Sequence, residues 1–210
     1  MANPPALSPD GYEIQFATNH LGHALLIKQL LPLLRMTAKN IDSDVRIVIT
    51  ASHGSTPSLA TSKGIHFHRL KTPQSMFLGP WRRYGQSKFA NLLYARALSK
   101  LNPQLKIVSV HPGMAFTNSK RNLGPLDKLF LKATAAAKAR PQHELAWNVI
   151  WAATSSREGL KSGSYYEPVG KLANLKKGNW NRDEGLEERL WAWTETELKR
   201  WGVKEEGRWR

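Results

Sequence analysis

The chain has 210 residues, the size of one domain, and it contains no cysteine, which excludes a disulfide framework and thiol chemistry. Its formal net charge is +15, but the basic residues are scattered and carry no recognised nucleic-acid motif, so we expect no nucleic-acid partner. No run approaches the ~20 apolar residues of a membrane span, and no basic-then-apolar leader pattern occurs. The composition fits a reducing, intracellular and cytoplasmic setting.

The first part of the chain predicts one helix and one strand. Ser8-Pro9 is typical of an N-cap followed by the first helical position, and it predicts a helix that carries Asn19 and ends near residue 34. Pro32 is expected to close or kink that helix. The run Arg46-Ile-Val-Ile-Thr-Ala-Ser52 is apolar and β-branched, which predicts a buried parallel strand over residues 45–50.

The rest of the chain continues the alternation of helices and strands. A long loop over residues 53–83 leads to a predicted helix over 84–101, and a second buried strand follows at 105–111. We expect a helix near 141–155, a short strand at 164–167, and a basic C-terminal helix and tail over 184–210. Without internal repeats, residues 1–210 are predicted to form a single α/β domain.

Three side chains at one end of this strand–helix–strand unit indicate acid–base chemistry. Tyr84 and Lys88 are four residues apart, so a helix presents both on one face. A nearby ammonium favours the phenolate and moves the pKa of Tyr84 from ~10 toward the range of a general acid or base. Ser52 follows a buried strand, where open α/β sheets bind ligands. A chance Tyr-x-x-x-Lys on a surface helix is the alternative interpretation.

The chain contains, in this order, Thr18-Asn-His-Leu-Gly-His23, the strand that ends in Ser52, Tyr84-x-x-x-Lys88, and His111-Pro-Gly-Met-Ala-Phe-Thr117, and these four motifs resemble the short-chain dehydrogenase/reductase family. The local sequences Asp10-Gly-Tyr-Glu-Ile-Gln-Phe, Ile65-His-Phe-His and Ser87-Lys-Phe-Ala-Asn91 resemble in particular its branch of retinol dehydrogenases and WW-domain oxidoreductases. The resemblance covers nearly all of residues 1–201. It implies an α/β fold that is the C-terminal part of a Rossmann-like, doubly wound parallel sheet, with residues 114–140 as the substrate lid.

The resemblance also implies a role for each motif residue in the NAD(P)-dependent interconversion of a small alcohol and a carbonyl. Tyr84 would exchange a proton with the substrate oxygen, Ser52 would hold that oxygen, and Lys88 would lower the pKa of Tyr84 and hold the nicotinamide ribose. Asn19 would hold a water that links Lys88 to solvent. The implied cofactor-binding residues are Tyr84, Lys88, Pro112, Gly113, Ala115 and Thr117, with NADP and NAD as alternatives.

The chain departs from the family pattern because neither Gly-x-x-x-Gly-x-Gly nor Gly-x-Gly-x-x-Gly occurs in it. Such a loop holds the cofactor pyrophosphate at a helix N-terminus. We therefore expect an N-terminally truncated sheet that lacks its first strand–helix repeats, and weak NAD(P) binding by these residues alone. In the family's sheet order, the strand at 45–50 pairs with the strand at 105–111 and leaves its other edge open.

The truncation leaves a second function open. The alternative is a catalytically silent remnant that acts through association or through binding to an anionic or membrane surface. The helices that carry Asn19 and Tyr84 are the family's usual subunit contact, so the resemblance also implies a homo-oligomer. Trp191, Trp193 and Trp201 lie beside basic residues and fit either peripheral membrane contact or, as we prefer, a C-terminal helix packed on the body.

Two histidine features have simpler interpretations. His66 and His68 alternate as on a strand, but the sequence signals no third ligand nearby, so no metal site is expected. His53 directly follows Ser52, yet no Gly-x-Ser-x-Gly elbow surrounds that serine, which argues against a hydrolase.

Overall fold

Helices and strands alternate along the part of the chain that the computed structural model describes, which is residues 3–53, 64–75, 79–114, 141–173 and 185–202. The helices and strands are α1 (Ile14–Phe16), α2 (Gly22–Thr37), β1 (Arg46–Thr50), α3 (Gly79–Leu101), β2 (Lys106–Val110), α5 (Trp147–Thr154), β3 (Tyr165–Glu167), β4 (Lys171–Leu172) and α6 (Leu186–Leu198). A π-helical segment, Ala17–Leu21, joins α1 to α2, and short 3-10 helices lie at Phe67–Arg69, Gln142–Ala146 and Lys199–Trp201.

The four strands form one sheet in the order β1–β2–β3–β4. β1 and β2 are parallel, with Ile47 opposite Ile107, β2 and β3 are also parallel, and β3 and β4 are antiparallel. The Ile and Val runs of β1 and β2 suit strands covered on both faces, because β-branched side chains pack well on a pleated surface. The predicted pairing of these two strands is confirmed, and β1 forms the edge of the sheet among the described residues.

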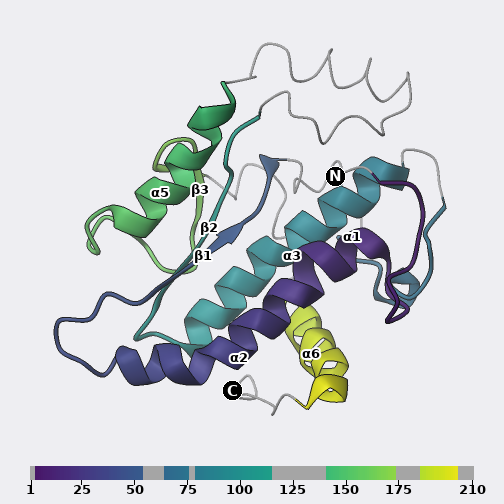
Figure 1. The fold of residues 1–210 in the computed structure, drawn as a ribbon, viewed down its shortest axis with the longest axis horizontal. Helices are drawn as coiled ribbons and strands as arrows, with labels where there is room; N and C mark the ends of the chain where they lie inside the picture. Colours follow the sequence, from purple (N-terminus) through teal and green to yellow (C-terminus); the bar gives the residue numbers. More distant parts are fainter. Residues whose placement is uncertain (1–2, 54–63, 76–78, 115–140, 174–184, 203–210) are drawn as a thin grey trace.

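Helices cover both faces of this sheet (Figure 1). Ile47, Ile49 and Ile107 belong to the larger core cluster, which includes the buried face of α3. Val108 and Val110 belong to a second cluster with Ala152 of α5. Because successive side chains of a strand point to opposite faces, this alternation places α3 and α5 on opposite sides of the sheet.

The C-terminal helix α6 packs against the helical layer formed by α2 and α3 (Figure 1). Trp191 of α6 is buried and stacks on Tyr94 of α3, with 5.4 Å between the ring centroids. Lys28 of α2 forms a buried ion pair with Glu195 of α6, with 2.7 Å between nitrogen and oxygen. The predicted C-terminal helix is confirmed, and Trp191 packs on the body of the protein as preferred above.

The start of the first helix differs from the prediction. Ser8 and Pro9 lie in a turn that brings Leu7 opposite Glu13, and the helix begins only at Ile14. The Glu13 carboxylate accepts hydrogen bonds from the backbone N–H groups of Gln15 and Phe16, at 3.1 and 2.8 Å. Glu13 therefore takes the capping role expected of Ser8, because it satisfies N–H groups that have no partner within the helix.

The other boundaries agree with the predictions within a few residues, except that α3 begins at Gly79, five residues before the predicted start. Pro32, expected to close or kink the first helix, does not close it: α2 continues through Pro32 to Thr37, with Pro32 on the exposed side of the helix. Residues 115–140, which make up nearly all of the predicted lid, lie outside the described residues. Within the described ranges, every helix is too short or too polar to cross a membrane.

Candidate active site

The candidate site lies at the carboxyl ends of β1 and β2, where parallel α/β sheets bind ligands. Ser52 follows β1 by two residues, and Pro112 and Gly113 follow β2. The N-terminal half of α3 passes this edge and carries Tyr84 and Lys88. Local spacing and strand topology thus bring together three residues that are separated by up to 36 positions in the sequence.

Tyr84 and Ser52 form a side-chain hydrogen bond. Burial raises the pKa of Tyr84 above its usual value, and the hydrogen bond with Ser52 lowers it in part. The phenol is therefore protonated at neutral pH and suited to donating a proton to an oxygen held by Ser52. This net direction is opposite to the one implied by the resemblance, and the lowering by Lys88 stays a prediction.

Lys88 lies four residues after Tyr84 and is half-buried. Its ammonium nitrogen donates a hydrogen bond to the Thr50 carbonyl oxygen, at 3.0 Å. Burial lowers the pKa of Lys88 to about 8, since desolvation disfavours the charged form. The bond to Thr50 uses one of the three hydrogens of the ammonium, which leaves donors for a further ligand.

Asn19 reaches the same region from the π-helical segment that precedes α2. Its side-chain amide donates to the Ser87 hydroxyl at 2.9 Å, and Ser87 lies between Tyr84 and Lys88 in the sequence. The structure therefore places Asn19 against the helix that carries the tyrosine and the lysine. Its role in a water-mediated relay stays a prediction.

The segment after β2 is described only in part. Gly113 has a φ of +105°, a conformation that glycine adopts without strain and other residues rarely adopt. Pro112 lies next to it and is half-buried. Ala115 and Thr117, the other two predicted cofactor-binding residues of this segment, lie outside the described residues.

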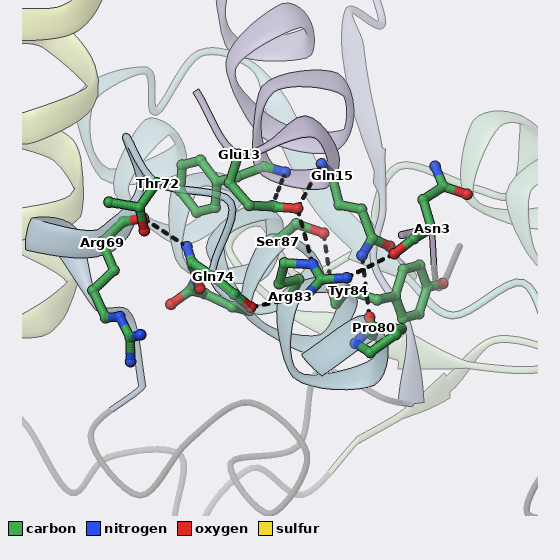
Figure 2. A network of polar contacts seen from close by, with 12 residues as sticks. Asn3, Glu13, Gln15, Arg69, Thr72, Gln74, Pro80, Arg83, Tyr84 and Ser87 are labelled. Carbon is green, nitrogen blue, oxygen red and sulfur yellow. Dashed lines mark hydrogen bonds and ion pairs between the residues drawn. The ribbon is translucent and has the colours of Figure 1, made fainter. Parts of the chain in front are cut away.

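A buried ion pair that the sequence did not reveal lies beside Tyr84. Arg83 and Glu13 have fully buried side chains, with 3.3 Å between Arg83 Nε and Glu13 Oε1. Figure 2 shows the Arg83 guanidinium between Glu13, the Gln74 carbonyl and the Asn3 carbonyl, with Tyr84 next to it. This network attaches the first turns of α3 to the segment that leads into Asn19. The pair Arg82-Arg83 at the end of the predicted loop is the one local signal in the sequence, and it does not identify Glu13 as the partner.

The described residues fit one end of a nicotinamide dinucleotide. The ammonium of Lys88 and the hydroxyls of Ser52 and Tyr84 match a ribose and a carbonyl or alcohol. The pyrophosphate needs a different donor set, namely backbone N–H groups of a glycine-rich loop at a helix N-terminus. That pattern is absent from the 210 residues, so the fit is restricted to the nicotinamide end.

His20, next to Asn19, gives the site region a pH-dependent stability. It is buried, its ring nitrogens lie 3.3 Å from Asn91 Oδ1 and 3.0 Å from Thr194 Oγ1, and burial lowers its pKa to about 4. The unfolded chain binds a proton at about pH 6.5 and the folded chain only near pH 4, so stability is lost as the pH falls between these values. Between pH 7 and 5 we expect a loss of about 2 kcal/mol from this group.

This loss can be measured by urea unfolding at pH 7 and pH 5. His20→Gln removes the titration, so its free energy of unfolding should fall about 2 kcal/mol less over this interval than that of the unaltered chain. His23→Gln is the control, because His23 is exposed on the next helical turn. An equal pH dependence in the unaltered chain and in His20→Gln would contradict the assignment.

The chain has a mainly parallel sheet covered by helices on both faces, and a serine, a tyrosine and a lysine gather near the carboxyl ends of its parallel strands. These features define a Rossmann-like α/β protein. Comparison with models of known protein families gives no match. The chain is 37% identical over 200 residues to an uncharacterised oxidoreductase of Schizosaccharomyces pombe, covering 91% of this chain and 57% of the relative. It is 34% identical over 215 residues to a short-chain dehydrogenase/reductase of Aspergillus calidoustus, covering 95% and 66%.

The fold is also similar to that of a solved structure. A protein of Mycobacterium paratuberculosis has the same fold with a TM-score of 0.65 and 27% identity, covering 95% of this chain and 63% of that one. The chain belongs to the short-chain dehydrogenase/reductase family, as its motifs indicated. It spans 57% and 66% of the lengths of the two curated relatives described above.

Proposed function

We propose that the chain carries the catalytic half of an NAD(P)-dependent oxidoreductase that interconverts an alcohol and a carbonyl. The observation that supports this most is the hydrogen bond between Ser52 and Tyr84, with Lys88 one helical turn further along α3. A proton donor and a second hydroxyl that meet at one point suit a single oxygen atom of a substrate. The membership of the chain in a family of oxidoreductases supports the same proposal.

In the reduction direction, the substrate oxygen accepts hydrogen bonds from Ser52 and Tyr84. Tyr84, whose phenol is protonated at neutral pH, transfers its proton to this oxygen as negative charge develops on it. When bound, the nicotinamide nucleotide supplies the hydride to the carbonyl carbon. Lys88 holds the ribose hydroxyls, and its nearby positive charge stabilises the phenolate that Tyr84 becomes. In the oxidation direction, the same groups take the proton from the alcohol.

The substrate class is a small carbonyl or alcohol compound, and the resemblance to the retinol-dehydrogenase branch favours a lipophilic one. NADP and NAD remain alternatives, because the residues that select between them belong to the glycine-rich half of the family's fold. The charge of +15 supports an anionic cofactor, since a basic surface raises its local concentration.

Tyr84→Phe tests the proposal. With either cofactor at millimolar concentration and a panel of lipophilic aldehydes and ketones, we expect slow turnover by the unaltered chain. Because the substitution removes the proton donor, it should lower kcat/KM by about 10²–10⁴-fold. Absorbance of the reduced nicotinamide at each substrate concentration measures the rate.

Tyr94→Phe is the matched control, because Tyr94 lies on the same helix but is buried against Trp191, away from Ser52. It should leave kcat/KM nearly unchanged. Full activity of Tyr84→Phe would refute the assigned role. An absence of turnover in the unaltered chain would favour the alternative of a catalytically silent remnant.

A further inference from the structure

A line of hydrogen bonds, buried over its first two bonds, connects α6 to Lys88. Thr194 of α6 contacts His20 Nε2 at 3.0 Å, and His20 Nδ1 contacts Asn91 Oδ1 at 3.3 Å. Asn91 Nδ2 then donates to the Thr50 carbonyl oxygen at 3.2 Å, and that oxygen also accepts from Lys88. Thr194, His20 and Asn91 are each at most 2% exposed, so water does not compete for the two bonds among these three side chains.

The direction of every bond in this line follows from the groups that make it. The Asn91 amide nitrogen donates to Thr50, so the Asn91 oxygen is the acceptor that faces His20. Nδ1 of His20 therefore carries the proton, Nε2 accepts, and the Thr194 hydroxyl donates to it. The lowered pKa of His20 agrees with a neutral ring held in one tautomer.

The Thr50 carbonyl oxygen is the point at which this line meets the candidate site. The backbone N–H of Ala51 donates to Val110 of β2 at 2.8 Å. Because consecutive residues of a strand direct their backbone groups to opposite edges, the Thr50 carbonyl points away from β2. Its two lone pairs are taken by two side chains of α3, three residues apart on one helical face, Lys88 and Asn91.

We propose that Asn91 and His20 are positioning residues for Lys88. Through them and the Thr50 carbonyl, the packing of α6 against α2 and α3 affects the position of the Lys88 ammonium in the candidate site. Asn91 shares the acceptor with Lys88 and so limits where the ammonium lies relative to Tyr84. His20 holds the Asn91 amide in the orientation that presents its N–H groups to Thr50, and Thr194 holds His20. The effect of this positioning on catalysis rests on the proposed function. The positioning of Lys88 itself does not, because it can be measured in the chain without cofactor or substrate.

The experiment measures the pKa of Lys88 in the 210-residue chain without cofactor or substrate. The chain is labelled with lysine enriched in ¹³C at Cε, the Lys88 resonance is assigned with Lys88→Arg, and its shift is followed against pH. In the unaltered chain we expect the lowered pKa, about 8. In Asn91→Ala the pKa should rise by about one unit toward 10.5, because Lys88 gains sole use of the Thr50 carbonyl and reaches water.

Asn102→Ala is the matched control. Asn102 is likewise a buried asparagine whose amide donates to a backbone carbonyl, that of Leu98, and whose oxygen accepts from a basic side chain, that of Arg35. It lies beyond the far end of α3, so its loss should lower stability and leave the pKa of Lys88 unchanged. An equal change of the Lys88 pKa in the two variants, or no change in Asn91→Ala, would overturn the proposal.

Thr194→Val provides a milder test if Asn91→Ala does not fold. It keeps the shape of the side chain but removes the hydroxyl that donates to His20, and it should raise the pKa of Lys88 by a smaller amount in the same direction. An unchanged Lys88 pKa in a folded Thr194→Val would refute the connection to α6. Because none of these measurements uses turnover, an inactive chain with the expected shifts would refute the proposed function and support the positioning network.

Discussion

Arg83→Met is expected to lower the free energy of unfolding by about 3–5 kcal/mol, because it leaves the Glu13 carboxylate buried without its cation. Both side chains of the pair are fully buried. Burial raises the pKa of Glu13 and lowers that of Arg83, so each charge depends on the other to remain in the interior. The substitution also removes the donors to the Gln74 and Asn3 carbonyls. Urea unfolding followed by circular dichroism measures the change.

Arg82→Met is the control for Arg83→Met, since Arg82 is the exposed neighbour on the same helix and should cost little. The double variant with Glu13→Gln should lose less stability than the sum of the two single variants, because the second substitution removes the unpaired charge. A loss below about 1 kcal/mol in Arg83→Met, as for an exposed pair, would show that the pair is not essential to the fold.

The 210-residue chain is expected to associate with itself in solution, with an apparent mass well above 23.7 kDa. Two features lead to this expectation. Among the described residues, β1 has β2 as its one neighbour in the sheet, so its other edge carries backbone groups that another strand can pair with. On α2, Leu26, Leu30 and Leu33 follow one helical face and are 52%, 43% and 55% exposed.

Sedimentation velocity across a range of concentrations tests this association. Leu30→Glu with Leu33→Glu should shift the distribution toward the monomer, because each exposed leucine contributes about 1–2 kcal/mol when a contact buries it. Asn40→Glu with Gln104→Glu adds the same charge at exposed polar positions outside α2 and should change little. A monodisperse monomer in the unaltered chain would mean that the open edge and the leucine face attract no partner.

The sequence by itself determined the parts of this protein that depend on neighbours along the chain. The apolar runs of β1 and β2 and the Tyr84-to-Lys88 spacing on α3 follow from periods of two and about four residues. The proximity of Ser52 and Tyr84 could also be predicted from the sequence. Parallel strands place their carboxyl ends at one edge of a sheet, and the helix that connects two such strands passes this edge. The residues and the order of the four motifs identified the family, and both can be read from the sequence alone.

Only the tertiary structure decided which polar groups meet in the interior. Glu13 replaces Ser8 as the helix cap, Arg83 selects Glu13 from 70 residues away, and Asn91 and Lys88 share a backbone oxygen. Lys28 and Glu195, which are 167 residues apart, form the buried ion pair between α2 and α6. A sequence shows that such residues are polar, but it does not show which partner each will have. A polar group is buried without a large desolvation penalty only where the fold brings a matching donor or acceptor to it, and that depends on the whole tertiary structure.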